Sequence, residues 1–192
     1  MKPLGWMAWI LCALISACAS QPKLPPRIML DGFSFAPLNE KEWTIVKQSP
    51  DMTVMGKPGR FSGEIFAMQA TLIKLPAIES PKELVRHLES TQRKDLDPKR
   101  YRVIKHEVMQ YQVHGKNCAL SSVEAAERTA TSGTGSPVNT MLETLTLICP
   151  HPKNASRGIN MVYSHRYFPE DVDPQFSTDG ALLMQSLAFE PL

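Results

Sequence analysis

The chain has 192 residues, of which 43% are hydrophobic and 21% are charged, and its formal net charge is +2 at pH 7. This length and composition fit one folded domain with a substantial core, and they are unlike those of a disordered or membrane-embedded chain. The near balance of charges excludes a strongly basic protein. The densest basic segment, residues 93–102, is interrupted by Asp95 and Asp97, so we expect no nucleic-acid partner.

The chain begins with features of an export signal. Lys2 precedes an apolar run over residues 6–15, and small residues follow in Ile15-Ser16-Ala17-Cys18. A positive start, a short apolar run and small residues before a cleavage point form a secretory signal peptide, and this run is too short for a permanent transmembrane helix. The last four residues resemble the lipobox of bacterial lipoproteins, in which the cysteine becomes the mature N-terminus and carries acyl chains such as palmitate. An ordinary secretory signal that contains a cysteine is the alternative interpretation.

The lipoprotein resemblance divides the chain into three parts. It implies a signal peptide over residues 1–17, a lipidated tether over residues 18–27 and one folded domain over residues 28–192. Cys18 is then the lipidation site that holds the protein to a membrane at the periplasmic face of the cell envelope, because several acyl chains anchor far more firmly than one. Ala19 stands where lipoproteins retained at the inner membrane carry an aspartate, which favours the outer membrane.

Short strands and one well-marked helix are predicted in the first half of the domain. The strand candidates are residues 32–36, 43–48, 52–55 and 64–75. The helix is expected over residues 80–97, where Ser80 can cap it, Pro81 suits its first turn and Glu83 completes a capping box. Its apolar stripe faces the core and consists of Leu84, Val85 and Leu88.

A strand over residues 101–114 leads through a tight turn into a predicted β-hairpin. Two segments of alternating polarity, 118–127 and 140–149, flank a loop of small residues over 129–137. Folding the hairpin about Gly133-Thr134 places Leu120 opposite Leu147, and it also places Glu124 opposite Glu143, which is an unfavourable pair of like charges. The same register predicts that Cys118 faces Cys149.

The two cysteines of the domain are expected to form a disulfide. Cys12 leaves with the signal peptide and Cys18 takes the lipid, so Cys118 and Cys149 remain in an oxidising compartment. A zinc site formed with His114 and His151 is the alternative. Such a site needs reduced thiolates and a short fixed spacing between the histidines, which this chain lacks. We therefore predict no metal site and no cofactor.

The last elements complete the expected fold class. A turn-rich connection over residues 151–158 leads to a strand over 159–167, which makes a meander of four antiparallel strands, and a helix is expected over 177–188 although Gly180 lowers its propensity. Two separated helices on a mostly antiparallel sheet indicate the α+β class. The order of short strands, capped helix, long meander and terminal helix is similar to the PsbP-like fold of the photosystem extrinsic subunit and its bacterial relatives. The resemblance rests on element order and assigns no functional residue.

No motif of catalysis is visible in the domain. The chain lacks a G-x-S-x-G nucleophile motif, and Gly133-Thr134-Gly135-Ser136 lacks the lysine and the strand-to-helix context of a phosphate loop. Two acidic groups could hold a cation or act as general acid and base: Glu124 with Glu127, and Glu170-Asp171 with Asp173. For the second group, the sequence favours a solvated turn before the last helix.

These observations favour a non-catalytic lipoprotein that binds or scaffolds a component of the envelope, with an envelope protein as a candidate partner. No catalytic residue is assigned. An envelope hydrolase whose site forms only on folding is the alternative. A deep pocket lined by histidine and acidic residues would favour the enzyme, whereas a shallow sheet face with apolar patches would favour the binding protein.

Overall fold

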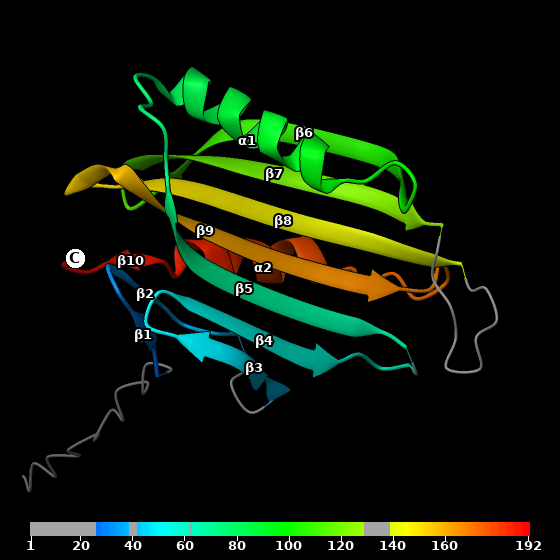
Figure 1. Cartoon of the computed structure of the whole chain (residues 1–192). Helices are drawn as coiled ribbons and strands as arrows, with labels where there is room; N and C mark the ends of the chain where they lie inside the picture. The colour runs from blue at the N-terminus through cyan, green and yellow to red at the C-terminus, as the bar shows by residue number, and fades with distance from the viewer. Residues whose placement is uncertain (1–25, 39–41, 62, 129–138) are drawn as a thin grey trace, which may run out of the picture.

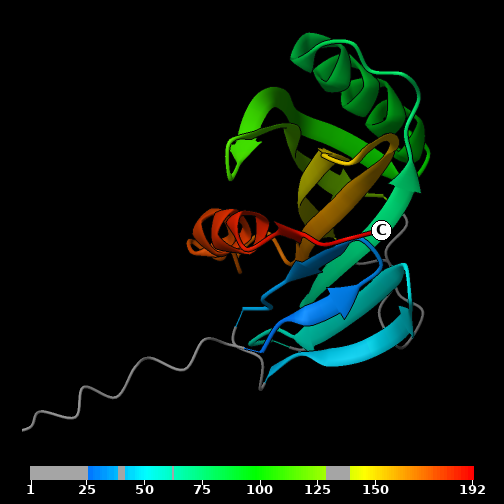
Figure 2. The ribbon, with the colours of Figure 1, turned by 90° about the vertical axis from the view of Figure 1, so that its left-hand side faces the viewer.

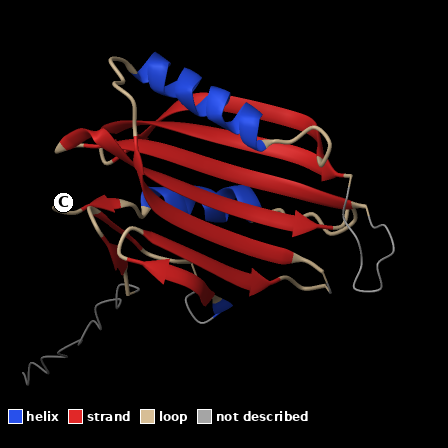
Figure 3. Ribbon diagram, in the orientation of Figure 1, coloured by secondary structure: helices blue, strands red, loops and turns tan. Residues whose placement is uncertain are grey.

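The computed structural model describes residues 26–38, 42–61, 63–128 and 139–192. These residues form two antiparallel sheets and two helices, as Figures 1 and 3 show, so the predicted α+β class is confirmed. The elements in chain order are β1 (Ile28–Leu30), β2 (Phe33–Phe35), β3 (Thr44–Ser49), β4 (Met52–Pro58), β5 (Ile65–Lys74), α1 (Pro81–Asp95), β6 (Tyr101–Val113), β7 (Lys116–Glu127), β8 (Thr140–His151), β9 (Asn154–Tyr167), α2 (Phe176–Gln185) and β10 (Ala188–Phe189).

A seven-stranded sheet with the order β3-β4-β5-β9-β8-β7-β6 organises the domain. After β5 the chain crosses the sheet through α1 to the far edge, and β6 to β9 then return as a meander until β9 pairs with β5. The predicted meander and the predicted hairpin register are confirmed, because Leu120 lies opposite Leu147 and Glu124 lies opposite Glu143. The hairpin loop over residues 129–137 lies outside the described residues.

The two faces of this sheet carry different layers. Figure 2 shows α1 and α2 on opposite faces. Helix α1 buries Leu84 and Leu88 against Ala119 and Ile148, which forms a small apolar cluster. Its predicted N-cap is confirmed, since the Glu83 backbone N–H donates to Ser80 Oγ over 3.2 Å. The Glu83 carboxylate accepts from the Glu79 backbone N–H instead of from Ser80, and the helix ends at Asp95, two residues earlier than expected.

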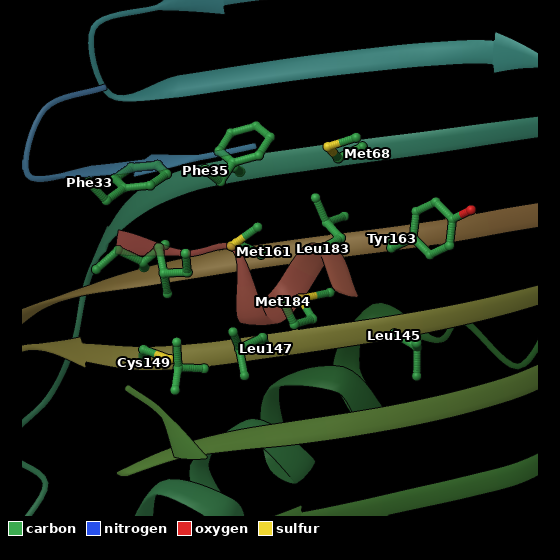
Figure 4. Close-up of a cluster of buried hydrophobic side chains, with 14 of the residues drawn as sticks. Phe33, Phe35, Met68, Leu145, Leu147, Cys149, Met161, Tyr163, Leu183 and Met184 are labelled. Carbon is green, nitrogen blue, oxygen red and sulfur yellow. The ribbon is translucent and has the colours of Figure 1, made fainter. Parts of the chain in front are cut away.

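The main core fills the other face, between the large sheet, α2 and the small sheet β1-β2-β10. Alternate residues of β5, β8 and β9 point into it, as a strand period of two requires. Figure 4 shows part of this core, where side chains from β2, β5, β8, β9 and α2 meet: Phe33, Phe35, Met68, Leu145, Leu147, Cys149, Met161, Tyr163, Leu183 and Met184. Trp43 is also buried here.

The close packing of helix α2 depends on Gly180, the residue whose low helix propensity argued against a helix here. A Cβ at Gly180 would collide with the Leu145 side chain on β8 and crowd Tyr163 on β9. The glycine therefore allows the helix to lie close against the sheet, and the packing energy gained there offsets the propensity lost, which is about 1 kcal/mol relative to alanine. The helix spans Phe176–Gln185 and not residues 177–188.

The predicted connection over residues 151–158 is wrong. Strand β8 continues to His151 and β9 already begins at Asn154, so only Pro152 and Lys153 form the turn. The reason is tertiary: β5 supplies ladder partners for this segment, with Lys74 opposite Arg157 and the Leu75 backbone N–H donating to Ser156 O over 2.9 Å. Strands β1 and β10, which have three and two residues, were not predicted because so short a segment carries no periodicity.

Both edges of the large sheet are protected against further strand pairing. Strand β3 has a bulge between Ile45 and Lys47, and β6 has one between Val103 and Lys105. A bulge followed by a lysine disfavours the addition of another strand. Addition of a further strand at either edge is therefore disfavoured. In the described part of the chain no helix is long and apolar enough to span a membrane.

Candidate functional site

A cleft of about 720 Å³ opens at the end of the sheet where β4, β5 and β9 meet the start of α2. This volume lies in the range of small-molecule sites. The wall on one side comes from β4 and the turn that follows it, and the wall on the other side comes from the segment after β9. Six carboxylates line the cleft among the described residues, against two cationic side chains: Glu42, Glu64, Glu170, Asp171, Asp173 and Asp179, with Lys57 and Arg60.

Glu64 organises the turn between β4 and β5. Its Oε2 accepts hydrogen bonds from the backbone N–H groups of Arg60 and Phe61. The Gly59 backbone N–H donates to Glu64 O over 2.9 Å, and a Cβ at Gly59 would fall onto the Glu64 carboxylate. The turn therefore needs glycine at this position, and it holds a carboxylate with only 4% of its side chain exposed in the wall of the cleft.

The other oxygen of this carboxylate contacts a buried histidine. His165 Nε2 lies 2.7 Å from Glu64 Oε1, and the histidine side chain is fully buried. Burial lowers the pKa of His165, and this effect outweighs the hydrogen bond and the charge of Glu64, which act to raise it. Burial alone would raise the pKa of Glu64, but the hydrogen bonds from His165, Phe61 and Arg60 lower it below its usual range. At neutral pH the pair is therefore a neutral imidazole that donates to a carboxylate.

Donation from Nε2 leaves His165 Nδ1 as an unprotonated acceptor. This nitrogen is buried and finds no hydrogen-bond partner in the described part of the chain. Aromatic rings enclose the imidazole on both sides: the Phe66 ring stacks on it at a centroid distance of 4.0 Å, and the Tyr167 ring stacks at 4.6 Å. The stacked rings and Glu64 together hold the imidazole in place. His165 therefore positions the Glu64 carboxylate in the wall of the cleft.

The acidic residues on the other wall repel one another. Dehydration, together with the charges of Glu170 and Glu64, raises the pKa of Asp171. Dehydration and the charge of Asp173 also raise the pKa of Asp179, although Lys57 opposes this. Crowded carboxylates raise one another's pKa because each disfavours the charged form of the next. A bound cation would relieve that repulsion.

The surroundings of Lys57 show how this cleft accommodates an ammonium group. Its Nζ lies 4.7 Å from the Phe66 ring centroid and 5.5 Å from the Trp43 ring centroid. The same nitrogen is 3.3 Å from Glu42 Oε2. Aromatic faces and a carboxylate are the surroundings that ammonium and guanidinium groups prefer.

The predicted disulfide lies at the opposite end of the strands. Cys118 and Cys149 are bonded, with Cα atoms 4.4 Å apart, so the thiolates that a zinc site needs are not available. His114 is exposed in the turn before β7, and His151 is buried and donates from Nε2 to the carbonyl oxygens of Gly32 and Glu190. In the described residues no group of three or more His, Cys, Asp or Glu side chains could hold a metal ion.

The structure separates the members of one predicted acidic group and keeps those of the other together. Glu124 and Glu127 are three residues apart on β7 and lie on opposite faces. Glu127 is buried and pairs with Arg100 at 3.0 Å, so it stabilises the fold. Glu170, Asp171 and Asp173 lie in the turn and irregular segment between β9 and α2, as the sequence predicted, and they also line the cleft. Cys18 and Gly133-Thr134-Gly135-Ser136 lie outside the described residues.

Sequence reasoning missed Glu64 and His165. The two residues are 101 positions apart, and only the pairing of β5 with β9, in which Phe66 lies opposite His165, brings them together. No spacing in the chain signals such a pair. Of the cleft, the sequence singled out only the acidic segment after β9.

Comparison with known proteins adds little to this geometry. No family model matches the chain, and no curated protein is detectably similar to it. A crystal structure from Bacteroides thetaiotaomicron VPI-5482 is similar, with a TM-score of 0.46 and 11% identity over 87% of this chain and 49% of that one, so the chain spans about half the length of that protein. Human StAR-related lipid transfer protein 5 is similar with a TM-score of 0.29 and 11% identity over 76% of this chain and 84% of that one. Both scores are too low to support an inference about family or function.

Proposed function

We propose that this protein is a lipid-anchored component of the bacterial cell envelope that binds an organic cation without converting it. The anchor in this proposal is Cys18, held in the outer membrane on its periplasmic side. Two features support export: the lipobox-like Ile15-Ser16-Ala17-Cys18, and a disulfide between Cys118 and Cys149, which is typical of oxidising compartments. The first strand begins at Ile28, which leaves residues 18–27 as the tether.

The acidic cleft is the observation that carries the binding role. Its carboxylates outnumber its cationic side chains. Two of those carboxylates, Asp171 and Asp179, have raised pKa values, which a bound cation would lower. Phe61 and Val172 add exposed apolar surface to the lining. A ligand that carries ammonium or guanidinium groups on an apolar chain matches this mixture of carboxylates and apolar contacts.

Burial of the Glu64–His165 pair favours binding over hydrolysis. A general acid or base must come within hydrogen-bond distance of the reacting group. His165 is fully buried and Glu64 nearly so, and every oxygen of Glu64 is already occupied by His165 or by the turn. The pair therefore shapes the cleft wall and does not supply the proton-transfer groups that the alternative, an envelope hydrolase, requires.

The anchor is tested on protein purified from its native envelope. Intact mass should show a mature chain that begins at Cys18 and carries acyl chains, and a Cys18→Ser variant should be released from the membrane. Density-gradient fractionation should place the wild-type protein with outer-membrane markers. A mature chain without acyl mass contradicts the anchor, and migration with inner-membrane markers contradicts only the location.

The cleft is tested by calorimetric titration with spermidine. Removing two charges in the variant Asp173→Asn/Asp179→Asn should weaken binding about three- to tenfold, because each exposed charge contact is worth roughly 0.5 kcal/mol. The matched control is Glu89→Gln/Glu107→Gln, which removes two exposed carboxylates that pair with Arg93 and Lys105 elsewhere on the surface. Absence of binding to the wild type, or equal weakening in both variants, contradicts the cleft as the site.

A further inference from the structure

A second pocket, of about 200 Å³, lies between helix α1 and the large sheet. One side comes from the C-terminal half of α1, and the other side comes from β7, β8 and β9. Five aliphatic side chains and five uncharged polar side chains line it, and Asp95 is the single charged residue of the lining among the described residues. The pocket shares no residue with the acidic cleft, and its chemistry suits a different kind of ligand.

The pocket exists because a polar residue interrupts the apolar stripe of α1. Leu84 and Leu88 pack the first half of the helix onto the sheet. One turn further along the same face the residue is Gln92, which is buried, and its Oε1 lies 3.0 Å from His106 Nε2 on β6. Figure 1 shows α1 lying along β6 and β7. The neighbouring surface of β8 and β9 is therefore left as the floor of the pocket.

The floor of the pocket contains a polar atom without a partner. Asn160 lies on β9 at the centre of the sheet, opposite Thr71 on β5 and Ile148 on β8. Its Oδ1 is buried and has no hydrogen-bond partner in the described part of the chain. Such an atom costs stability and needs a reason in a folded protein. A ligand hydroxyl in the pocket would supply the missing hydrogen bond.

We propose that this pocket binds a small uncharged molecule that carries a hydroxyl group on an apolar body, such as an aromatic alcohol. Its size fits, because an apolar cavity of about 150 Å³ already takes up benzene. The aliphatic side chains contact the apolar body, and Asn160 receives the hydroxyl group. An anionic ligand is excluded, because it would lose hydration and find no positive charge in the lining.

The test is a fluorine NMR titration of the purified full-length protein with para-fluorobenzyl alcohol and with para-fluorotoluene, which lacks the hydroxyl. The variant Val162→Phe fills the pocket from β9. The matched control is Val54→Phe on β4, which makes the same change outside the pocket. Both valines are half-buried and lie on the same face and in the same row of the sheet, on either side of Gln69.

The wild-type protein should bind the alcohol about fivefold more tightly than the toluene, which is the usual effect of one hydrogen bond. Val162→Phe should weaken the binding of both probes about tenfold or more, because its ring takes their place. Val54→Phe should leave both affinities unchanged. Absence of saturable binding to the wild type, or equal weakening in both variants, overturns the proposal and shows that the pocket holds only water.

A third variant tests the hydroxyl contact and keeps the pocket open. Asn160→Leu should still bind the toluene but lose the preference for the alcohol. It should also melt at a higher temperature than the wild type, because the unpaired polar atom is gone. A preference that survives in Asn160→Leu overturns the assigned ligand class. If Val162→Phe does not fold, the ratio of the two affinities in Asn160→Leu decides by itself.

Discussion

The two ends of the large sheet each bury a histidine, and the surroundings of the two rings differ. At the disulfide end, His151 donates from Nε2 to the carbonyl oxygens of Gly32 and Glu190, and its Nδ1 accepts from the Lys153 backbone N–H over 3.3 Å. At the cleft end, His165 donates from Nε2 to Glu64, and its Nδ1 has no partner in the described residues. Both ring nitrogens of His151 are therefore hydrogen-bonded, whereas Nδ1 of His165 is an acceptor without a donor in the described residues.

This difference separates a structural histidine from one beside a candidate site. Buried polar atoms are almost always hydrogen-bonded, and an exception in a folded protein needs a reason. His151 ties the end of β8 to Gly32, just before β2, and to Glu190, just after β10, so it connects the two sheets. His165 instead positions a carboxylate that lines a cleft, and its unpaired nitrogen costs stability that only other interactions of the site can offset. The polar groups at the disulfide end stabilise the fold, whereas those at the cleft end maintain an acidic surface at some cost in stability.

Removing the disulfide should have the largest effect on stability. In the chain-entropy model, a link across 31 residues contributes about 3 to 4 kcal/mol to the free energy of unfolding. The variant Cys118→Ala/Cys149→Ala should therefore melt roughly 10 °C lower while keeping the same fold. Thermal unfolding followed by circular dichroism measures this. An unchanged melting temperature would show that the disulfide end does not carry the stability assigned to it.

Truncating Glu64 should have the next largest effect. Glu64→Ala leaves two backbone N–H groups and the His165 N–H without an acceptor, which should cost about 2 to 3 kcal/mol in unfolding free energy. Urea denaturation measures this cost. The control is Glu42→Ala, which removes an exposed carboxylate of the same cleft that pairs with Lys57 and should cost less than about 1 kcal/mol. Equal costs would contradict the role of Glu64 in the turn.

Replacing His151 should cost somewhat less. His151→Phe removes the donor shared by two buried carbonyl groups, which should lower the unfolding free energy by about 1 to 2 kcal/mol. The exposed His114 is the control, and His114→Asn should be neutral because asparagine tolerates the positive φ of 47° found there. If His151→Phe is also neutral in urea denaturation, then His151 does not hold the sheets together.

The smallest effect concerns pH and is specific to the cleft end. The pKa of His165 is lowered by folding, so below about pH 6.5 the unfolded chain takes up a proton that the folded chain does not. Stability is therefore fully present above that pH and falls on acidification, and the lowered pKa of Glu64 acts in the same direction below its own unfolded value. The raised pKa values of Asp171, Asp179 and Glu143 act in the opposite direction on acidification.

The histidine is therefore followed between about pH 7.5 and about pH 5.5, a range that brackets the pH near 6.5 at which the unfolded chain takes up its proton. The urea midpoint of the wild-type protein should fall across this window, and His165→Asn should remove part of that slope. A slope that is the same in the wild-type protein and in His165→Asn would mean that folding does not perturb the titration of His165.

Sequence patterns predicted the long-range meander well because its signals are local. Alternation along β6 to β9 defines each strand, and the symmetric placement of Cys118 and Cys149 about the loop defines the register. The capping residues Ser80 and Glu83 likewise locate the start of α1. The patterns failed for β1, β10 and the start of β9, where the pairing partner and not the segment itself decides the conformation. The resemblance to the PsbP-like fold and the lipidation of Cys18 stay predictions.

The sequence by itself determined the α+β class, the disulfide and the order of most elements, because periodicity, capping and cysteine count act over short stretches of chain. Only the tertiary structure decided that β5 pairs with β9, that Gly180 admits the close approach of α2, and that Glu64 meets His165. Those contacts join residues far apart in the chain, and their energies come from burial and hydrogen bonds that exist only after folding. The acidic cleft belongs to this second group, since its walls come from segments separated by about a hundred residues.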